Sequence, residues 1–484
     1  MNVDEGKIAT FGFNAEYSGT STQPIVAVVA VDGKRYRLNG TPAASGKSYA
    51  VSLKTIPFAE GGKTVSTVTF RLCTTSSCNS VYPGSTSSFT VNLDVRLKDW
   101  ATFQRDAAHS GYVAVKYDAV NFASAWTMPV SANDRITGIA ATRGSLFVNL
   151  APPYGSQINL QTRAIDSGTG GIIWDYDLGN KNYYSAPSYS NGRVVSAAMD
   201  ISSGNIPIDV IDAKTGRYLR SLSYSSQFAN SGTPTPFDDE LYLQAGYYGN
   251  VVFGYNSAMG TRRWVTDTTQ INGGYVQEGE SVAADARFVY FFSSGYLVAL
   301  NRSSGEIAHN IRNPFFGSVG LSYYGSYFGA PILDGTGRVF TFSDNRPQDV
   351  NLPLVAFSIK SDSVLWRTKR SYGGEPALRD GKLYAIRADS RIIDIIDTAD
   401  GSVDGSINLG SGVDPLNSNL VLTESHLFVA NDSKTYAIDI QNSAFPTVWS
   451  ADQGGSLAIT PDNVLVISSR TRGLYAYRLS GSNS

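Results

Sequence analysis

The sequence predicts an all-β protein in which an immunoglobulin-like β-sandwich precedes an eight-bladed β-propeller of four-stranded blades. Two patterns predict this class. Apolar and polar side chains alternate in short segments near the start, which is the pattern of half-buried strands. Further along, a strand–turn–strand motif recurs at steps of roughly 45 residues, a repeat length typical of propeller blades. No segment shows the period of an amphipathic helix.

The sandwich is expected over residues 1–97. Its clearest strand runs from Phe89 to Leu97, where apolar and polar residues alternate without a break. About seven short strands fit this length, as in immunoglobulin-like domains. We interpret this unit as a spacer, with an adhesion module as the alternative. Residues 98–121 form a linker, and the propeller occupies residues 122–484.

Both cysteines, Cys73 and Cys78, lie in the first unit. Metal or redox chemistry is one interpretation, but no further Cys or His stands near enough in sequence to complete a zinc site. The sequence favours a disulfide that closes a small loop in an oxidising compartment. Because the loop is short, we expect the bond to add at most ~2–3 kcal/mol.

The best-preserved propeller repeat runs from Ala164 to Trp174. We expect Asp166 to accept N–H groups of the turn, Gly170 to supply a positive φ, and Trp174 to pack between sheets. Weaker copies place further blade-docking residues at Asp212, Gly216, Trp264, Trp366 and Trp449.

The repeats give eight inner strands but only seven complete outer strands. The segment 122–130, with Trp126 at the docking position, supplies the missing strand. A strand from the start of the propeller that completes the last blade closes the ring and removes free sheet edges.

The motif Ala164-x-Asp166-x-x-Thr169-Gly170-x-x-x-Trp174 resembles the tryptophan-docking repeat of quinoprotein-like propellers. That family includes the pyrroloquinoline quinone (PQQ) dehydrogenases and the BamB-like lipoproteins of outer-membrane assembly. The run Trp100-x-x-Phe103-x-x-Asp106-x-x-His109-x-Gly111 is similar to the leading segment of the BamB-like branch. The resemblance covers residues 100–484 and implies the propeller fold, in which each Trp packs between neighbouring blades.

The chain departs from both branches. Alcohol-type PQQ dehydrogenases hold a vicinal Cys–Cys disulfide against the cofactor, whereas both cysteines here precede the propeller. No motif matches the calcium ligands or the catalytic Asp of those enzymes. BamB-like proteins lack a leading β domain, and no lipidation Cys is present. We therefore predict no cofactor, with PQQ and calcium required only if the protein is a PQQ-dependent oxidoreductase.

Composition favours an exported protein of the periplasm or cell surface. Charged residues make up 17% of the chain, below the usual ~25%. The formal net charge of −2 gives no argument for nucleic acid or an anionic membrane. The longest apolar run, Ile25 to Val31, is too short for a membrane span. No signal peptide is visible in the sequence.

No residue pattern predicts catalysis or metal binding. The three histidines fit structural positions, and the carboxylates of Glu278, Glu280 and Asp285 fit a solvated loop better than an acid–base pair. Aromatic and Arg residues instead gather in the connections opposite the Asp turns, where they either bind a partner or pack to close the rim. The expected binding residues are Tyr183, Tyr184, Tyr247, Tyr248, Tyr275, Phe316, Tyr323, Tyr324, Tyr327, Arg346, Arg391 and Arg470.

The sequence thus favours a non-enzymatic, monomeric scaffold of the bacterial cell envelope. It would bind a protein or a glycan through this rim. The alternative is a PQQ-dependent oxidoreductase of the quinoprotein dehydrogenase type.

Overall fold

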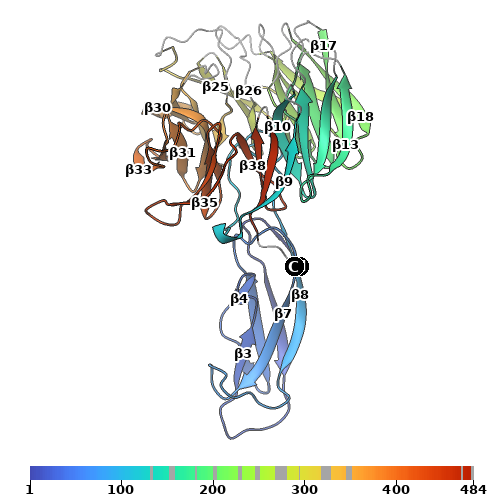
Figure 1. Ribbon diagram of the computed structural model, residues 1–484, viewed down its shortest axis with the longest axis vertical. Helices are drawn as coiled ribbons and strands as arrows, with labels where there is room; N and C mark the ends of the chain where they lie inside the picture. The colour runs from blue at the N-terminus through green and yellow to red at the C-terminus, as the bar shows by residue number, and fades with distance from the viewer. Residues whose placement is uncertain are drawn as a thin grey trace. The chain divides into compact units, whose positions relative to one another are not determined.

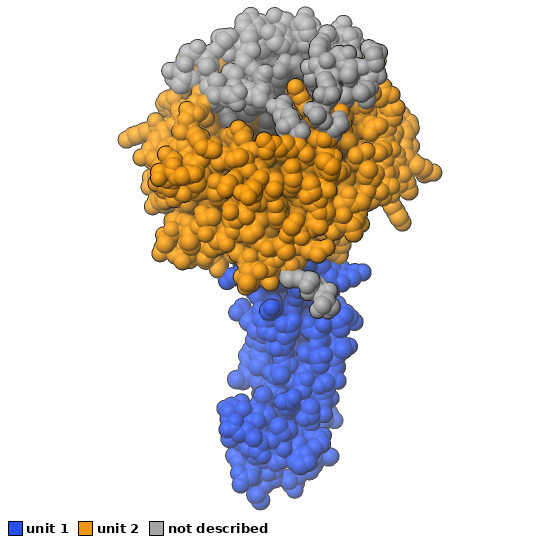
Figure 2. Space-filling view, in the orientation of Figure 1, with its two compact units in different colours: residues 1–98, 114–117 blue, residues 99–113, 118–484 orange. Residues whose placement is uncertain are grey.

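The computed structural model divides into two compact units (Figure 2). Unit 1 comprises residues 1–98 and 114–117, and unit 2 comprises residues 99–113 and 118–484. The structure describes residues 1–130, 134–151, 159–179, 183–199, 204–226, 232–245, 251–267, 281–293, 295–317, 329–344, 351–469 and 472–480.

Unit 1 is built from two sheets that share one hydrophobic core, the arrangement of a β-sandwich (Figure 1). One sheet has the order β1-β8-β7-β3, and the other has the order β2-β6-β4, with β5 also paired to β6. Leu53 of β6 and Val68 of β7 are fully buried between them. The strands are β1 (Asn2–Asp4), β2 (Thr10–Glu16), β3 (Val26–Ala30), β4 (Tyr36–Leu38), β5 (Ala43–Ser45), β6 (Ser48–Thr55), β7 (Gly62–Cys73) and β8 (Ser87–Arg96).

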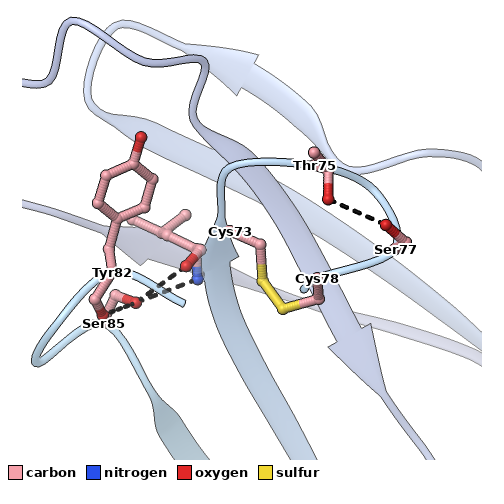
Figure 3. Close-up of a disulfide and its surroundings, with 7 residues drawn as sticks. Cys73, Thr75, Ser77, Cys78, Tyr82 and Ser85 are labelled. Atoms are coloured by element: carbon pink, nitrogen blue, oxygen red, sulfur yellow. Dashed lines mark hydrogen bonds between the residues drawn. A yellow bond between two sulfur atoms is a disulfide. The ribbon is translucent and has the colours of Figure 1, made fainter. Parts of the chain in front are cut away.

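A disulfide joins Cys73, the last residue of β7, to Cys78 (Figure 3). The turn between them is also held by Cys78 N–H, which donates to Thr75 O at 3.0 Å. Nearby, the Ser85 hydroxyl donates to Tyr82 O at 2.7 Å. The bond therefore fixes the turn that follows β7 and does not join the two sheets.

The described residues of unit 2 form eight successive antiparallel blades of four main strands, and the fifth and sixth blades are joined in one seven-stranded sheet (Figure 1). Blades 1 to 4 contain β10 (Arg135–Thr142), β11 (Ser145–Ala151), β12 (Leu160–Asp166), β13 (Ile172–Gly179), β15 (Ser188–Ser190), β16 (Arg193–Met199), β17 (Gly204–Asp212), β18 (Tyr218–Ser226), β19 (Thr235–Phe237), β20 (Glu240–Ala245), β21 (Val251–Asn256), β22 (Thr261–Asp267), β23 (Ala283–Ala284), β24 (Phe288–Ser293), β25 (Tyr296–Asn301) and β26 (Ile307–Arg312). A short strand β14 (Tyr183–Tyr184) also pairs with β16.

Blades 5 and 6 share one long strand, β30 (Ser363–Arg379), which is the outer strand of blade 5 and then the inner strand of blade 6. The remaining strands of blades 5 to 8 are β27 (Ile332–Leu333), β28 (Arg338–Phe342), β29 (Leu352–Ser358), β31 (Lys382–Arg387), β32 (Ile392–Asp397), β33 (Val403–Asn408), β34 (Val421–Leu422), β35 (His426–Ala430), β36 (Thr435–Asp439), β37 (Thr447–Ala451), β38 (Ser456–Ile459), β39 (Val464–Ser469) and β40 (Gly473–Arg478).

The ring closes as the repeat count requires. After a short 3-10 helix, η1 (Ala119–Asn121), strand β9 (Ala123–Pro129) pairs antiparallel with β40 and becomes the fourth strand of blade 8. Trp126 lies opposite Ala476 in this pairing. Strands from the start and the end of unit 2 thus lie in one sheet.

Each well-preserved repeat forms the same turn. The Asp166 carboxylate accepts the Thr169 N–H and the Thr169 hydroxyl, both at 2.8 Å. Asp212 does the same with Thr215, at 2.8 Å and 2.7 Å. These bonds satisfy turn groups that the strands leave unpaired and fix the direction of the return strand.

A tryptophan from one blade lies on this turn of the next blade. The Trp126 indole N–H donates to Ser167 O at 2.9 Å, and its ring covers Gly170, where an added Cβ would lie only 2.7 Å from the ring. Trp174 repeats both contacts with Ala213 O and Gly216. Trp264 makes the same contacts with Arg302 O and Gly305. Trp366 makes them with Thr398 O and Gly401.

Where the tryptophan is replaced, another side chain takes the position. Arg220 of blade 2 lies against Gly260 and donates to Ala258 O. His309 of blade 4 places Nδ1 2.6 Å from Asp362 Oδ1. In blade 7 the tryptophan is present, and Trp449 packs edge-on against Tyr477, with ring centroids 4.9 Å apart. Contacts between blades therefore persist where an arginine or a histidine stands in place of the tryptophan.

The segment Trp100–Val113, called here the central segment, bonds to the inner strands of seven blades in turn. Trp100 exchanges two backbone hydrogen bonds with Ala141 of blade 1, at 2.9 Å and 2.8 Å. The further bonds are Tyr189 N–H to Ala101 O, Thr102 hydroxyl to Pro234 O, Ala284 N–H to Ala107 O, Leu333 N–H to Ala108 O, Leu378 N–H to Ser110 O and Leu422 N–H to Gly111 O.

The eighth blade joins this network through two amide side chains. The Asn419 side chain donates to Gln104 Oε1 at 2.8 Å and also exchanges hydrogen bonds with the backbone of Leu457 in β38. Gln104 in turn donates to Pro376 O at 3.0 Å. The central segment therefore connects the inner strands around the whole ring.

His109 is one of the fully enclosed residues of the central segment. Its side chain is fully buried, and neither ring nitrogen has a hydrogen-bond partner among the described residues. Its ring centroid lies 5.7 Å from that of Phe103. Burial lowers the pKa of His109 to about 4, against a smaller opposing effect of Asp106. The imidazole is therefore neutral at pH 7.

Candidate binding rim

Strand direction fixes two opposite ends for the propeller. The Asp turns join the third strand of a blade to the fourth, so the connections between the second and third strands lie at the other end. The connections from one blade to the next lie at that end too. This end is called here the binding rim.

Most of the residues expected to bind a partner lie outside the described residues. They are Tyr247, Tyr248, Tyr275, Tyr323, Tyr324, Tyr327, Arg346 and Arg470. Tyr183 is described only as part of β14, without its side chain. Three expected binding residues remain, which are Tyr184, Phe316 and Arg391.

Tyr184 does not present its ring to a partner, so this part of the expectation is wrong. Its side chain is 2% exposed and packs in the core formed by blades 1 to 3. Its hydroxyl donates to Leu178 O at 2.7 Å. Burial raises the pKa of Tyr184 well above its usual range. Tyr184 lies opposite Ala198 of β16 in the β14–β16 pairing, and its side chain is part of the core.

Phe316 and Arg391 are half-buried, and each contacts other residues of the rim loops. Phe316 packs on Phe292 with ring centroids 6.4 Å apart, and its ring covers Gly295. The Arg391 guanidinium donates to Ser411 O at 2.8 Å and to Val413 O at 3.1 Å. Neither side chain is fully available to a partner.

The described part of the rim contains one organised cationic cluster, on blade 6. The Asp394 carboxylate in β32 is fully buried and accepts Arg387 Nη2 at 2.6 Å and Arg370 Nη1 at 3.1 Å. Tyr372 and Ser406 donate to the same carboxylate at 3.1 Å and 2.6 Å. The Arg370 side chain is 50% exposed and that of Arg387 is 28% exposed.

The electrostatics of this cluster leave one positive charge in excess. Burial raises the pKa of Asp394, but hydrogen bonds from Arg387 and Ser406 and the charge of Arg387 outweigh burial and hold it below its ordinary value. One carboxylate therefore faces two guanidinium groups, both of which reach solvent. A guanidinium fixed on one side by a carboxylate can donate from its other side to an acidic group of a ligand.

Sequence reasoning missed this cluster, although the sequence contained a signal. Asp394 interrupts the apolar run Ile392–Ile396 in a middle strand. An ionised carboxylate at a buried position requires cationic partners, and the neighbouring strand ends in Arg387. That pairing could have been proposed from the sequence, whereas the contribution of Arg370 depends on the unusual length of β30.

The described residues do not fit the cofactor set of a PQQ dehydrogenase. Among them, no three His, Cys, Asp or Glu side chains gather so as to hold a metal ion. Cys73 and Cys78 are bonded to each other in unit 1, so they cannot form a vicinal disulfide in the propeller. No catalytic step through PQQ is therefore derived for this chain.

The ring of four-stranded blades and the docked tryptophans define a β-propeller of the PQQ-repeat class. The family model for the outer membrane protein assembly factor BamB matches residues 159–404. Since the match spans half of the chain, the protein belongs to that family. No curated protein matches the sequence.

Solved structures show the same fold. BamB from Moraxella catarrhalis is 13% identical with a TM-score of 0.54, covering 74% of this chain and 99% of that chain. A europium-containing methanol dehydrogenase is 12% identical with a TM-score of 0.55, covering 79% and 98%. A quinohemoprotein alcohol dehydrogenase from Comamonas testosteroni is 13% identical with a TM-score of 0.52, covering 80% and 81%. At these identities the similarity establishes the fold alone.

Among the described residues, no helix has the length and apolar character needed to cross a bilayer.

Proposed function

We propose that the protein is a non-enzymatic scaffold of the bacterial cell envelope that binds a protein or glycan partner through the binding rim. The observation that carries this proposal is the Arg370–Arg387 pair on Asp394. Its excess charge lies at the end of the propeller where connections are longest and most varied in sequence. Binding residues commonly lie on such connections over a rigid scaffold.

The cluster is suited to recognising an acidic group. Asp394 holds both guanidinium groups before any partner arrives, so little side-chain freedom is lost on binding. A hydrogen bond to a charged group contributes about 1.5–3 kcal/mol. Two such bonds, supported by the aromatic residues expected in the neighbouring connections, can select a partner that presents carboxylates or sulfates.

An envelope location is supported by two features. The chain belongs to the family of an outer-membrane assembly factor, and its two cysteines are joined by a disulfide. Disulfides persist in oxidising compartments such as the periplasm and the cell surface.

The test compares two variants that each lose two positive charges. Arg370→Gln/Arg387→Gln alters the binding rim, whereas Lys214→Gln/Arg217→Gln alters exposed positions in the Asp turn of blade 2, at the opposite end. Partners are captured from envelope extract with the wild type, identified by mass spectrometry, and their affinities are measured. The rim variant should bind its partner at least about a hundredfold more weakly, because two bonds of about 1.5 kcal/mol each are lost and ~1.4 kcal/mol corresponds to a tenfold change. Equal weakening in both variants would indicate only a general effect of charge.

A PQQ-dependent oxidoreductase is the second candidate, because the fold is shared with methanol and alcohol dehydrogenases. Adding PQQ and calcium to the purified protein tests it directly. A bound chromophore together with dye-linked alcohol oxidation would replace the scaffold proposal.

A further inference from the structure

We propose that Asn39 is a site of covalent modification, at which the backbone nitrogen of Gly40 displaces the side-chain ammonia and converts the asparagine into aspartate or isoaspartate. Asn39 and Gly40 directly follow β4 in unit 1. The inference does not depend on the function proposed for the binding rim. It rests on the surroundings of two Asn-Gly dipeptides, which differ in the folded chain.

The reaction needs only water as co-reactant. The Gly40 nitrogen attacks Cγ of Asn39, and the new C–N bond closes a cyclic imide. The bond from Cγ to Nδ2 breaks, and the side-chain nitrogen leaves as ammonia with the proton that the Gly40 N–H gives up. Water then adds to the imide. Addition at Cγ leaves aspartate, whereas addition at the backbone carbonyl of residue 39 leaves isoaspartate. Either product carries a carboxylate that asparagine lacks.

The Gly40 nitrogen is available for this attack. Among the described residues, its N–H has no hydrogen-bond acceptor. The pairing of β4 with β6 ends at Leu38, so no strand partner covers the nitrogen. Gly40 is exposed, and an added Cβ would meet nothing within 4 Å. Because glycine has no Cβ, no side chain obstructs the approach of its own nitrogen to Cγ.

The side chain of Asn39 is free to turn towards that nitrogen. Among the described residues it makes one hydrogen bond, from Nδ2 to Ser52 Oγ at 3.3 Å. Both side chains are exposed, so water can replace this bond. The backbone N–H of Asn39 donates to Ser52 O at 2.9 Å. The residue is therefore held at the end of β4, while its side chain and the next nitrogen are not.

Two cations lie on the same face of the sheet as Asn39. Arg37 of β4 lies directly opposite Lys54 of β6, and Thr10 of β2, on the other side of Lys54, is uncharged. Arg37 and Asn39 are two residues apart and point the same way. Neighbouring positive charges favour a group that gains negative charge. They stabilise the nitrogen as it loses its proton, and the new carboxylate reduces the repulsion between like charges that face each other.

The second described Asn-Gly dipeptide, Asn191-Gly192, is protected. The Gly192 N–H donates to Tyr189 Oη at 3.2 Å. The Asn191 side chain donates from Nδ2 to Asp239 Oδ1 at 3.0 Å. Ring closure would break both bonds, and the Asp239 carboxylate disfavours a further negative charge beside it. The same dipeptide is therefore expected to react at Asn39 and to resist reaction at Asn191.

The test incubates the full chain at mildly alkaline pH in water enriched in the heavy oxygen isotope. Each imide that opens takes up oxygen from this water, and digestion in ordinary water leaves any later reaction unlabelled. Mass spectrometry of the fragments should show labelled aspartate and isoaspartate at position 39. Asn191 should react at least about tenfold more slowly, because ring closure there breaks two hydrogen bonds. The fragment with Asn272-Gly273, which lies outside the described residues, is analysed separately.

Unfolding the chain in guanidinium chloride separates the effect of the fold from that of the dipeptide. Asn39 and Asn191 then lose the contacts that distinguish them, so their rates should become equal. Equal rates in the folded protein would overturn the proposal, and so would an unchanged Asn39. A sugar attached to Asn39 in protein isolated from its source would also overturn it, because Asn39-Gly40-Thr41 would then be used as a glycosylation sequon.

Two charge variants test the contribution of the cations. Arg37→Gln/Lys54→Gln removes both positive charges beside Asn39 and should slow its conversion about twofold to fivefold, the effect expected of exposed charges. Lys47→Gln/Lys63→Gln removes two exposed cations elsewhere in unit 1 and should leave the rate unchanged. Equal slowing in both variants would contradict the part assigned to Arg37 and Lys54.

Discussion

Replacing Gly170 with alanine should lower the unfolding free energy through two effects that act together at the Asp turn of blade 1: backbone strain and a steric clash with Trp126. Gly170 has a φ of 76°, a conformation that costs a residue with a Cβ about 1–2 kcal/mol. The added methyl would also lie 2.7 Å from the ring of Trp126. Forcing extra atoms into a packed site costs about 1–3 kcal/mol. The sum predicts that Gly170→Ala lowers the unfolding free energy by about 2–5 kcal/mol.

Gly192 provides a matched control. Its φ is 79°, and an added Cβ would meet nothing within 4 Å. Gly192→Ala should therefore cost only the backbone term of about 1–2 kcal/mol. The difference between the two substitutions measures the contact between neighbouring blades.

A double-mutant cycle with Trp126→Ala completes the test. Without the indole ring, Gly170→Ala should cost no more than Gly192→Ala, which leaves a coupling of about 1–3 kcal/mol. All six tryptophans lie in unit 2, so their fluorescence during urea unfolding reports on the propeller alone. Equal costs for Gly170→Ala and Gly192→Ala in the wild-type background would refute the docking argument.

Three further outcomes are expected. Replacing Cys73 and Cys78 with serine should lower the unfolding free energy of unit 1 by about 2 kcal/mol, given the short loop that they close. Calorimetry should show this loss, whereas the transition of unit 2 reported by tryptophan fluorescence should not change. The folded pKa of His109, about 4, lies below its ordinary 6.5, so the unfolded state binds the extra proton first. The unfolding free energy of the propeller should show no loss from His109 above pH 6.5 and should fall by about 3 kcal/mol as the pH drops to 4. In urea unfolding, His109→Gln should remove this part of the pH profile. Asp394→Asn should lower the unfolding free energy by about 2–3 kcal/mol. This is less than the ~3–5 kcal/mol lost when a fully buried pair is broken, because half of the Arg370 side chain is exposed. A loss below ~1 kcal/mol in urea unfolding would contradict the assigned role of that carboxylate.

The repeats were predictable because their chemistry is local. Asp166, Thr169 and Gly170 lie within one turn, and their hydrogen bonds and positive φ follow from sequence spacing. The same spacing placed Trp126 in the closing strand, although its partner blade is distant in the chain. The propeller class could therefore be predicted in full.

The central segment and the Asp394 cluster could not be predicted in the same way. Most bonds of the central segment are backbone bonds to strands throughout the propeller, and backbone groups leave no pattern in the sequence. Tyr184 was placed on the rim because its loop position was clear, while its burial depends on the direction of β14. Side-chain direction in short, irregular strands is set by tertiary packing.

The closing strand β9 and the central segment also determine the order in which the protein can be completed during synthesis. Both are made before the first blade, yet β9 pairs with β40, close to the end of the described chain. The inner strands that bond to the central segment are made one after another as synthesis proceeds. The ribosome must therefore release nearly the whole propeller before its first strand can pair. Until then, the edges of the newest blade remain open, and a factor that covers exposed strands would be most useful at that stage.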